Sequence, residues 1–377
     1  MKILAVILLI TGLLFTSGCW DYQIIDDLAI AFGMGIDQKD SDPEKVVVTF
    51  NNPAFVLEAE EQVVKTTVAG YSIKQALVSA QLQLDKELVL GKLSTLVFSE
   101  ETALNGNMHR TLQHLEQIRD VDPSAFICIT RGTSAQHVLN LTPPEQPRVA
   151  VYLADMLNMN YIEGRIPRSF LFRYWFNFNS PEISPVIPIV ELANDEEKTN
   201  RVTLTGLAAI NQDGRMVGNL TDTEMLIFKF LKDDILRGRY YTHIYYKGEN
   251  RLVTSNIKNI TRKIKSSIVN HKPVIDVKIG MDLDITDIDL PLEDKYEEEV
   301  FRGLEQALSR DFQGNMQKVI KKTQEWETDI VGLGQFVRIQ NPRWFREINW
   351  KEEYRESDIN IQTSIRVEKL GTIINPR

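Results

Sequence analysis

Residues 274–285 read Val-Ile-Asp-Val-Lys-Ile-Gly-Met-Asp-Leu-Asp-Ile, and this stretch indicates the architecture of the carboxyl-terminal part of the 377-residue chain. Apolar side chains alternate with mostly polar ones, which is typical of a strand with one buried face. An apolar stripe at helical spacing follows over residues 292–326, and its acidic start and basic end suit the helix dipole. We therefore expect one long helix that packs over an antiparallel sheet.

Strand and helix patterns also alternate nearer the amino terminus. Helical spacing marks residues 72–84, with Ser72 as the N-cap, and residues 107–119. Asp213-Gly214 between two apolar runs predicts a β-hairpin. Further strand candidates are 46–50, 62–68, 93–98, 125–130, 240–246, 250–260 and 358–368. We expect a multi-domain α+β fold in which mixed and antiparallel sheets are each packed with helices.

Length and composition shifts divide the chain into four parts. A chain of this length forms two or three domains. Residues 166–191 combine four prolines with six aromatic side chains, so we expect a packed connection at the end of the first domain. The predicted parts are a signal peptide at 1–18, an amino-terminal α/β domain at 19–192 including this connection, a middle segment of hairpin, helix and strands at 193–260, and a carboxyl-terminal α+β domain at 261–377.

The amino terminus has the pattern of an export signal. Lys2 precedes an uncharged apolar run at 3–15, and Thr16-Ser-Gly-Cys19 follows. The run is shorter than the ~20 residues that span a bilayer, so we expect cleavage. A cysteine after small residues is typical of a bacterial lipoprotein, whose thiol carries a diacylglycerol thioether. The alternatives are an ordinary secreted protein cut elsewhere and a retained amino-terminal helix.

Composition argues against nucleic-acid binding and against a disulfide. The formal net charge is −9, whereas phosphate binding needs concentrated Lys and Arg. If Cys19 is acylated, Cys128 has no intramolecular partner. Cys128 lies in an apolar, β-prone run, which predicts a buried strand residue rather than a reactive nucleophile.

Catalytic and metal-binding patterns are missing from the sequence. We find no P-loop, GxSxG, HExxH or CxxC motif. His109 and His114 lie five residues apart on a predicted helix, so their rings point about 140° apart. The acidic residues at 282, 284, 287 and 289 lack the spacing of a calcium loop. We expect no enzyme activity, no cofactor and no metal site.

Several collinear motifs resemble the Ger(x)C family of spore germination lipoproteins. The amino-terminal ones are Cys19-Trp-Asp21, Asp27-Leu-Ala-Ile30 and Gly33-Met-Gly-Ile-Asp37. The later ones are Gly206-Leu-Ala-Ala, Asp213-Gly214, Met216-Val-Gly218, Asp329-Ile-Val-Gly-Leu-Gly334, the stretch 342–345, Trp350 and Val367 before Gly371. The similarity covers nearly the whole mature chain.

This resemblance implies a location, partners and a role. The family supplies the C subunit of nutrient germinant receptors in endospore-forming bacteria. Its members sit on the outer face of the cell membrane, which in spores is the inner spore membrane, beside the integral-membrane A and B subunits. The implied role is non-catalytic: assembly of the receptor or signalling in germination. The implied fold is several mixed α/β domains with antiparallel sheets.

Aromatic residues within these motifs are candidate membrane or partner contacts. Trp20 follows the lipidated cysteine and suits the headgroup layer, or it packs on the first domain. Trp344, Phe345 and Trp350 lie among basic residues, a composition common at interface hot spots, although burial under the sheet is the favoured interpretation.

Glycines in two motifs have structural interpretations. Gly33 and Gly35 favour tight turning or close backbone approach over ligand contact. The stretch 329–334 is interpreted as a helix C-cap and turn.

Two other protein classes share the predicted anchor. A solute-binding lipoprotein of a transporter has two doubly wound lobes around a cleft, which fits the long antiparallel strand candidates poorly. A surface cell-wall hydrolase needs convergent acidic residues, which one sequence cannot locate.

Overall fold

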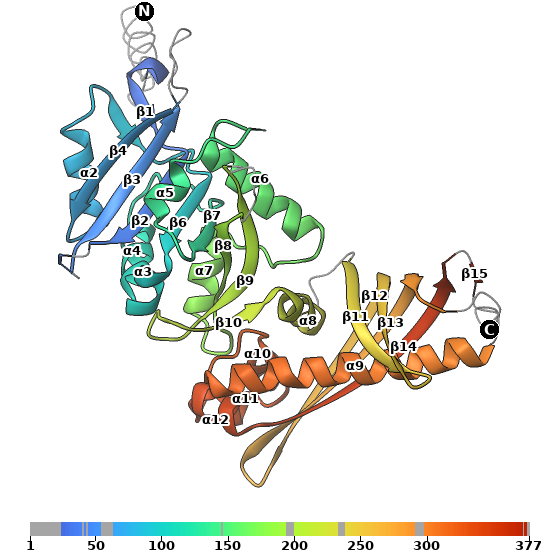
Figure 1. Ribbon diagram of the computed structural model, residues 1–377. Coiled ribbons are helices and arrows are strands. Elements are labelled where there is room, and N and C mark those ends of the chain that lie inside the picture. The colour runs from blue at the N-terminus through green and yellow to red at the C-terminus, as the bar shows by residue number, and fades with distance from the viewer. Residues whose placement is uncertain are drawn as a thin grey trace, which may run out of the picture.

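The computed structural model describes residues 24–39, 41–42, 44–53, 63–144, 146–193, 200–232, 238–290, 298–371 and 373–374. Two large sheets organise this part of the chain (Figure 1). A 3₁₀ turn, η1 (Ile25–Asp27), and a small parallel pair, β1 (Leu28–Ile30) with β5 (Glu87–Val89), come before and beside the first of them. Within the described residues, none of the helices combines the length and apolar composition needed to cross a bilayer.

The first sheet has eight strands in the order β10-β9-β8-β7-β6-β2-β3-β4. Its four central strands run parallel to one another, and antiparallel strands extend it on both sides. The strands are β2 (Gly33–Gln38), β3 (Val46–Pro53), β4 (Val63–Gly70), β6 (Thr95–Ser99), β7 (Phe126–Thr130), β8 (Val186–Leu192), β9 (Val202–Ile210) and β10 (Met216–Thr221).

Helices cover both faces of the first sheet, as Figure 1 shows. Along β6, Leu96 and Phe98 face one core and Val97 faces the other, so every residue of this strand is buried. One face carries α2 (Ile73–Gln81), α3 (Glu100–Asn105), α4 (Asn107–Glu116) and α7 (Leu171–Phe178), and the other carries α5 (Ala135–Leu139) and α6 (Val149–Ile162).

Two predicted local signals are confirmed, and the structure adds a third at α8. The Ser72 hydroxyl accepts the amide hydrogen of Gln75 at 3.2 Å and caps α2. The predicted hairpin joins β9 to β10, and Asn211 Oδ1 accepts the amide hydrogens of Asp213 and Arg215 across its turn. At α8 (Asp222–Lys232), the Glu224 carboxylate accepts the Thr221 amide hydrogen at 2.9 Å, as in a capping box.

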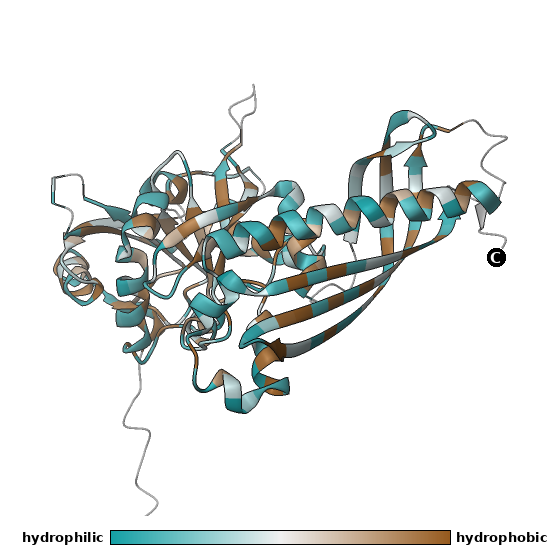
Figure 2. Cartoon of the chain, turned by 90° about the horizontal axis from the view of Figure 1, so that it is seen from below, coloured by the Kyte–Doolittle hydropathy of each residue, from teal (hydrophilic) through white to brown (hydrophobic). Residues whose placement is uncertain are grey.

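The second sheet has five strands in the order β11-β12-β13-β14-β15. These are β11 (Gly238–Tyr246), β12 (Glu249–Val269), β13 (Lys272–Ile288), β14 (Asp358–Leu370) and β15 (Ile373–Ile374). The long helix α9 (Glu298–Glu325) packs along it, and its apolar and polar residues alternate around the helix in Figure 2. Residues 291–297, where the predicted helix begins, lie outside the described residues.

One pairing in the second sheet differs from the antiparallel expectation. β14 runs parallel to β13, whereas β12 is antiparallel to it. Parallel neighbours need a long crossover connection, and α9 provides it between β13 and β14. The fold class is confirmed, with a mixed second sheet.

Side chains from helices cover parts of β14 and of β12 in the second sheet. Along β14, Ser309 Oγ accepts the amide hydrogen of Ile365 and Glu305 Oε1 accepts that of Val367. β11 pairs with β12 only as far as Ile257; beyond it, Gln340 of α10 (Leu333–Gln340) bonds to the Ser266 amide at 2.7 Å. Along these stretches, such covering hinders edge-to-edge pairing with other chains.

The proline-rich segment, predicted to be a packed connection, contains regular elements. Residues 171–178 form α7 and residues 186–192 form β8. Three of the prolines lie outside these elements. Pro188 lies inside β8, but β7 pairs with β8 only at Ile189 and Val190, so β7 needs no amide hydrogen from the proline.

The predicted middle segment, 193–260, contributes to both sheets. Its hairpin belongs to the first sheet, and β11 and the start of β12 belong to the second. The four-part domain division stays a prediction.

Candidate functional site at the junction of the two sheets

The aromatic residues singled out from the sequence do not form one exposed patch. Phe345 of α11 (Pro342–Phe345) and Trp350 of α12 (Trp350–Glu356) are buried in the core shared by both sheets, and Trp344 is partly buried against it. This burial of Phe345 and Trp350 agrees with the favoured interpretation, and contact with a membrane or a partner stays a prediction. Cys19 and Trp20 lie outside the described residues.

Trp350 instead belongs to a buried network around Asp329. Asp329 Oδ1 accepts the amide hydrogen of Gly332 at 2.7 Å. Its Oδ2 accepts the amide hydrogen of Gly334 at 2.7 Å and the indole hydrogen of Trp350 at 3.1 Å. Gly332, with φ of 85°, is the N-cap of α10, so this motif begins a helix rather than ending one. Because both oxygens are occupied, the carboxylate is a structural group and not an available base.

Burial raises the pKa of Asp329 above its ordinary value of 3.8. The hydrogen bonds from Gly334, Gly332, Leu333 and Trp350 lower the pKa and offset burial only in part. The carboxyl group is thus held in the interior by donated hydrogen bonds.

The same loop fastens the second sheet to the first. The Asp329 carbonyl oxygen accepts the amide hydrogen of Ser184, from the loop between α7 and β8, at 2.9 Å. In that loop the buried Glu182 pairs with Arg338 of α10 at 2.9 Å. Lys232, at the end of α8, donates to the Ile330 carbonyl at 2.9 Å. Two segments distant in sequence, the loop at 182–184 and the end of α8, therefore meet residues 329–338.

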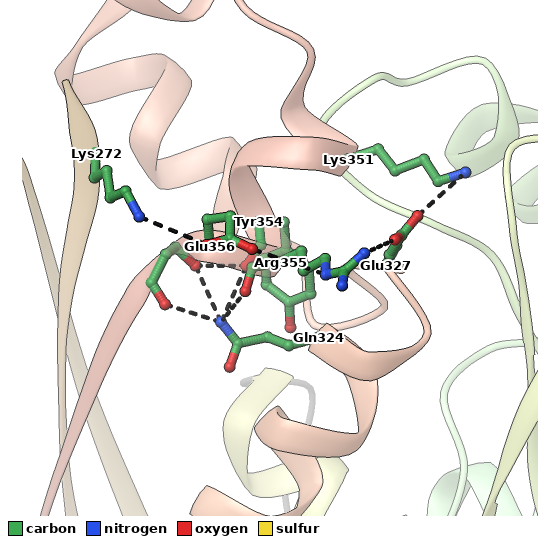
Figure 3. A network of polar contacts seen from close by, with 8 residues as sticks. Lys272, Gln324, Glu327, Lys351, Tyr354, Arg355 and Glu356 are labelled. Atoms are coloured by element: carbon green, nitrogen blue, oxygen red, sulfur yellow. Dashed lines mark hydrogen bonds and ion pairs between the residues drawn. The ribbon is translucent and has the colours of Figure 1, made fainter.

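A second polar network holds the end of α9 beside α12 (Figure 3). Gln324 Nε2 donates to the carbonyl oxygens of Tyr354, at 3.0 Å, and Ser357, at 2.9 Å. The Glu327 carboxylate accepts from Arg355 at 2.7 Å and lies 3.6 Å from the Lys351 ammonium group. These contacts fix the chain where it leaves α9 and again where it enters β14.

Gly33 and Gly35 allow close helix packing on β2, as predicted. A Cβ atom on Gly33 would lie 2.7 Å from the Ala150 side chain, and one on Gly35 would lie 2.9 Å from Leu139. Nearby, the Asp37 carboxylate accepts the amide hydrogens of Ala135, at 2.7 Å, and Gln136, at 2.8 Å. This motif therefore positions helices, and the close-approach interpretation is confirmed.

Cys128 is buried in β7, as predicted. Burial raises the pKa of its thiol to about 12. The thiol therefore stays protonated at neutral pH and is a poor nucleophile. Within the described ranges, no three His, Cys, Asp or Glu side chains gather where a metal ion would bind.

His109 of α4 is half enclosed by aromatic rings. Its Nδ1 lies 2.8 Å from the Tyr174 hydroxyl, and its ring stacks on Phe178 with 3.8 Å between centroids. Burial lowers the pKa of His109 below its ordinary value of 6.5. The neutral ring is therefore the form that the fold favours.

We expect His109 to make the protein less stable at mildly acidic pH. The folded state lowers the pKa of His109. The contribution of His109 to the free energy of unfolding is therefore complete above pH 6.5 and is lost as the pH falls through the lowered pKa. Urea unfolding measured at several pH values between about 7.5 and about 5 should show a steeper fall in the free energy of unfolding for wild type than for His109→Gln. Equal slopes would contradict the assignment, and His114→Gln provides a control on the same helix.

A cavity of about 410 Å³ opens beside the junction. Arg168, Ser169 and Arg173 line it together with Lys232, Arg262 and Phe336. These residues come from both sheets and their helices, so the sequence analysis did not single them out. The one local signal is the mixture of Arg and aromatic residues near residue 170.

Comparison with known proteins identifies related chains. Residues 21–192 match the family described as spore germination protein N-terminal domain, and residues 205–371 match spore germination B3/GerAC like, C-terminal. The chain is 24% identical to spore germination protein B3 of Bacillus subtilis (strain 168) over 371 residues, with 96% of each chain covered. It is 22% identical to spore germination protein GerQC of Bacillus cereus, with 95% of this chain and 96% of that one covered.

A solved structure shares the fold. The crystal structure of the GerBC protein matches with a TM-score of 0.59 and 20% identity, over 89% of this chain and 96% of that chain.

Proposed function

The chain belongs to the GerAC/GerBC-like family of spore germination proteins, the C subunits of germinant receptors, and we propose that it is a lipid-anchored, non-catalytic receptor subunit. Proteins of this family are generally non-catalytic. We propose that the chain acts by protein contacts with the integral-membrane A and B subunits, in receptor assembly or in germination signalling. Its place would be the outer face of the membrane, which in spores is the inner spore membrane.

The observation that carries this proposal is the position of the two family matches relative to Cys19. They follow it in order and together cover most of the remaining chain. The amino-terminal match begins at residue 21, two residues after the candidate lipidation site. The first described residue, Ile24, is five residues beyond Cys19, which an extended chain spans in about 18 Å. An acylated Cys19 would therefore hold η1 and β1 close to the membrane surface.

The position of this end in the fold supports the orientation. η1 and β1 lie at the outer end of the first-sheet unit, away from the second sheet (Figure 1). Ile24 and Ile25 are exposed there, at 49% and 69% of their surface. We propose that this end faces the lipid and that the second sheet extends away from the anchor.

A deletion experiment tests the receptor role. Spores without this chain and its paralogues should germinate slowly in nutrients, whereas agents that bypass nutrient receptors should act normally. A chain with an affinity tag should co-isolate the A and B subunits from detergent-solubilised spore membranes. Normal nutrient germination in the deletion strain would contradict the proposal.

Two direct assays test the alternative protein classes, a solute-binding lipoprotein of a transporter and a cell-wall hydrolase. A transport receptor should bind free amino acids or sugars tightly by itself, so calorimetric titration of the purified chain separates it from a receptor subunit. Zymography on peptidoglycan tests for a hydrolase. The fold disfavours a transport receptor, because a mixed sheet with one long helix replaces the second doubly wound lobe.

A further inference from the structure

Cationic and aromatic side chains line the cavity beside the junction. Its volume, about 410 Å³, falls within the range of small-molecule sites. The described residues that line it include four cationic side chains and no carboxylate. Aromatic side chains complete it, namely Tyr161, Phe170, Tyr174, Phe176 and Phe336.

Arg168 and Arg173 leave their charge accessible to the cavity. Both side chains are exposed and lie over aromatic rings, Arg168 at 4.7 Å from Tyr161 and Arg173 at 5.5 Å from Phe172. Neither forms an ion pair with a carboxylate in the described part of the chain. Stacked guanidinium groups keep their planar N–H edges available for bidentate bonds to an anion.

Lys232 and Arg262 add further positive charge to the cavity lining. Lys232 Nζ donates to the Ile330 carbonyl, and Arg262 donates to the Leu231 carbonyl while its guanidinium group lies 5.2 Å from the Phe336 ring. These contacts hold both side chains in the cavity wall. They come from α8 and from β12, so the site needs both sheets.

Ser169 gives an independent indication of a ligand. It lines the cavity between the two arginines in the sequence, and only 5% of its surface is exposed. Its hydroxyl has no hydrogen-bond partner among the described residues. A buried hydroxyl without a partner costs folding free energy, which a bound acceptor would recover.

We propose that this cavity binds a small anion, a carboxylate or phosphate group carried on an apolar or aromatic body. The Arg168 and Arg173 guanidinium groups and the Ser169 hydroxyl bond to the anionic group, and the aromatic side chains of the cavity contact the apolar body. This function goes beyond the proposed receptor role and does not depend on it. The anionic group could come from a free metabolite or from a lipid headgroup, and the test separates these sources.

Calorimetric titration of the purified full chain in detergent tests the proposal. The probes are phenyl phosphate and benzoate, with benzyl alcohol as the uncharged control, and dihexanoyl phosphatidylglycerol as the soluble lipid. We expect the free anions to bind and benzyl alcohol not to bind. Binding of the lipid alone would assign the anionic group to a headgroup and would retain the proposed site.

Variants locate the binding. Arg168→Gln combined with Arg173→Gln should weaken anion affinity by at least about tenfold. The matched pair Arg343→Gln with Arg346→Gln, exposed and outside the cavity, should bind like wild type. Ser169→Ala should weaken affinity about fivefold without lowering thermal stability in the absence of ligand, because it removes an unpartnered hydroxyl.

Two results would overturn the proposal. One is the absence of binding for every anionic probe. The other is equal binding by the cavity pair and the matched control pair. Either result leaves the receptor role intact, since that role is judged by spore germination and by co-isolation of subunits.

Discussion

Replacing Cys19 with alanine is expected to release the chain from the membrane fraction almost completely and to slow germination in nutrients. Alanine has no thiol, so no thioether can form. Each buried CH₂ contributes ~0.8 kcal/mol to membrane affinity, so two acyl chains hold a protein stably where one binds reversibly. The net charge of −9 offers no electrostatic attraction to anionic lipid that could replace them.

The second cysteine provides a matched control for this variant. Cys128→Ala removes the other thiol of the chain, which is buried in β7, and should leave membrane attachment unchanged. Immunoblots of membrane and soluble fractions measure attachment, and mass spectrometry of the native amino terminus measures the adduct. An unmodified Cys19, or a Cys19→Ala chain that stays in the membrane fraction, would show that the anchor is not this thioether.

Local signals predicted many of the strands and the helices α2, α4 and α9. The Ser72 cap, the hairpin at Asp213-Gly214 and the long apolar stripe after residue 291 each depend on neighbouring residues alone. The parallel pairing of β13 with β14 could not be predicted in this way. It depends on where α9 places residue 358 relative to residue 274, and alternation in a strand does not reveal the direction of its neighbour.

The segment 166–191 contains a helix and a strand despite its four prolines, for a physical reason. The rule against proline in strands assumes that its missing amide hydrogen is needed on that side of the strand. β7 pairs with β8 only at two residues beyond Pro188, so this need does not arise. Sequence alone does not show how far two strands pair.

The candidate site could be predicted only in part. Its motifs at 33–37 and 329–334 were recognised, and the close approach at Gly33 and Gly35 was predicted. The bond from Trp350 to Asp329 spans 21 residues, and the cavity residues come from both sheets. Such contacts are created by tertiary packing, which has no local pattern.

Replacing Asp329 with alanine is expected to destabilise the chain by about 3 kcal/mol, because it leaves buried donors without an acceptor. The amide groups of Gly332 and Gly334 and the indole of Trp350 would lose their bonds to one carboxylate. Removing the carboxylate also removes the free-energy cost of burying it, which limits the loss of stability. Urea unfolding of the purified full chain, followed by tryptophan fluorescence, measures the difference.

Two control variants separate the causes of this loss. Asp287→Ala removes an exposed carboxylate from β13 and should change stability by no more than about 0.5 kcal/mol. Asp329→Asn keeps the volume of the side chain but turns an amide NH₂ group toward a donor. A large loss of stability in this variant would therefore be caused by the missing acceptor oxygen and not by empty space around a smaller side chain.

Hydrogen exchange shows whether Asp329 holds the two sheets together. The Ser184 amide bonds to the main-chain oxygen of Asp329, which the substitution leaves in place. Faster exchange at Ser184 in Asp329→Ala would therefore mean that the loop itself has loosened, whereas exchange in β6, at the centre of the first sheet, should stay slow. If Ser184 stays protected while α10 exchanges faster, the carboxylate supports only its own helix, and the two sheets are joined by the remaining contacts of Glu182 with Arg338 and of Lys232 with Ile330.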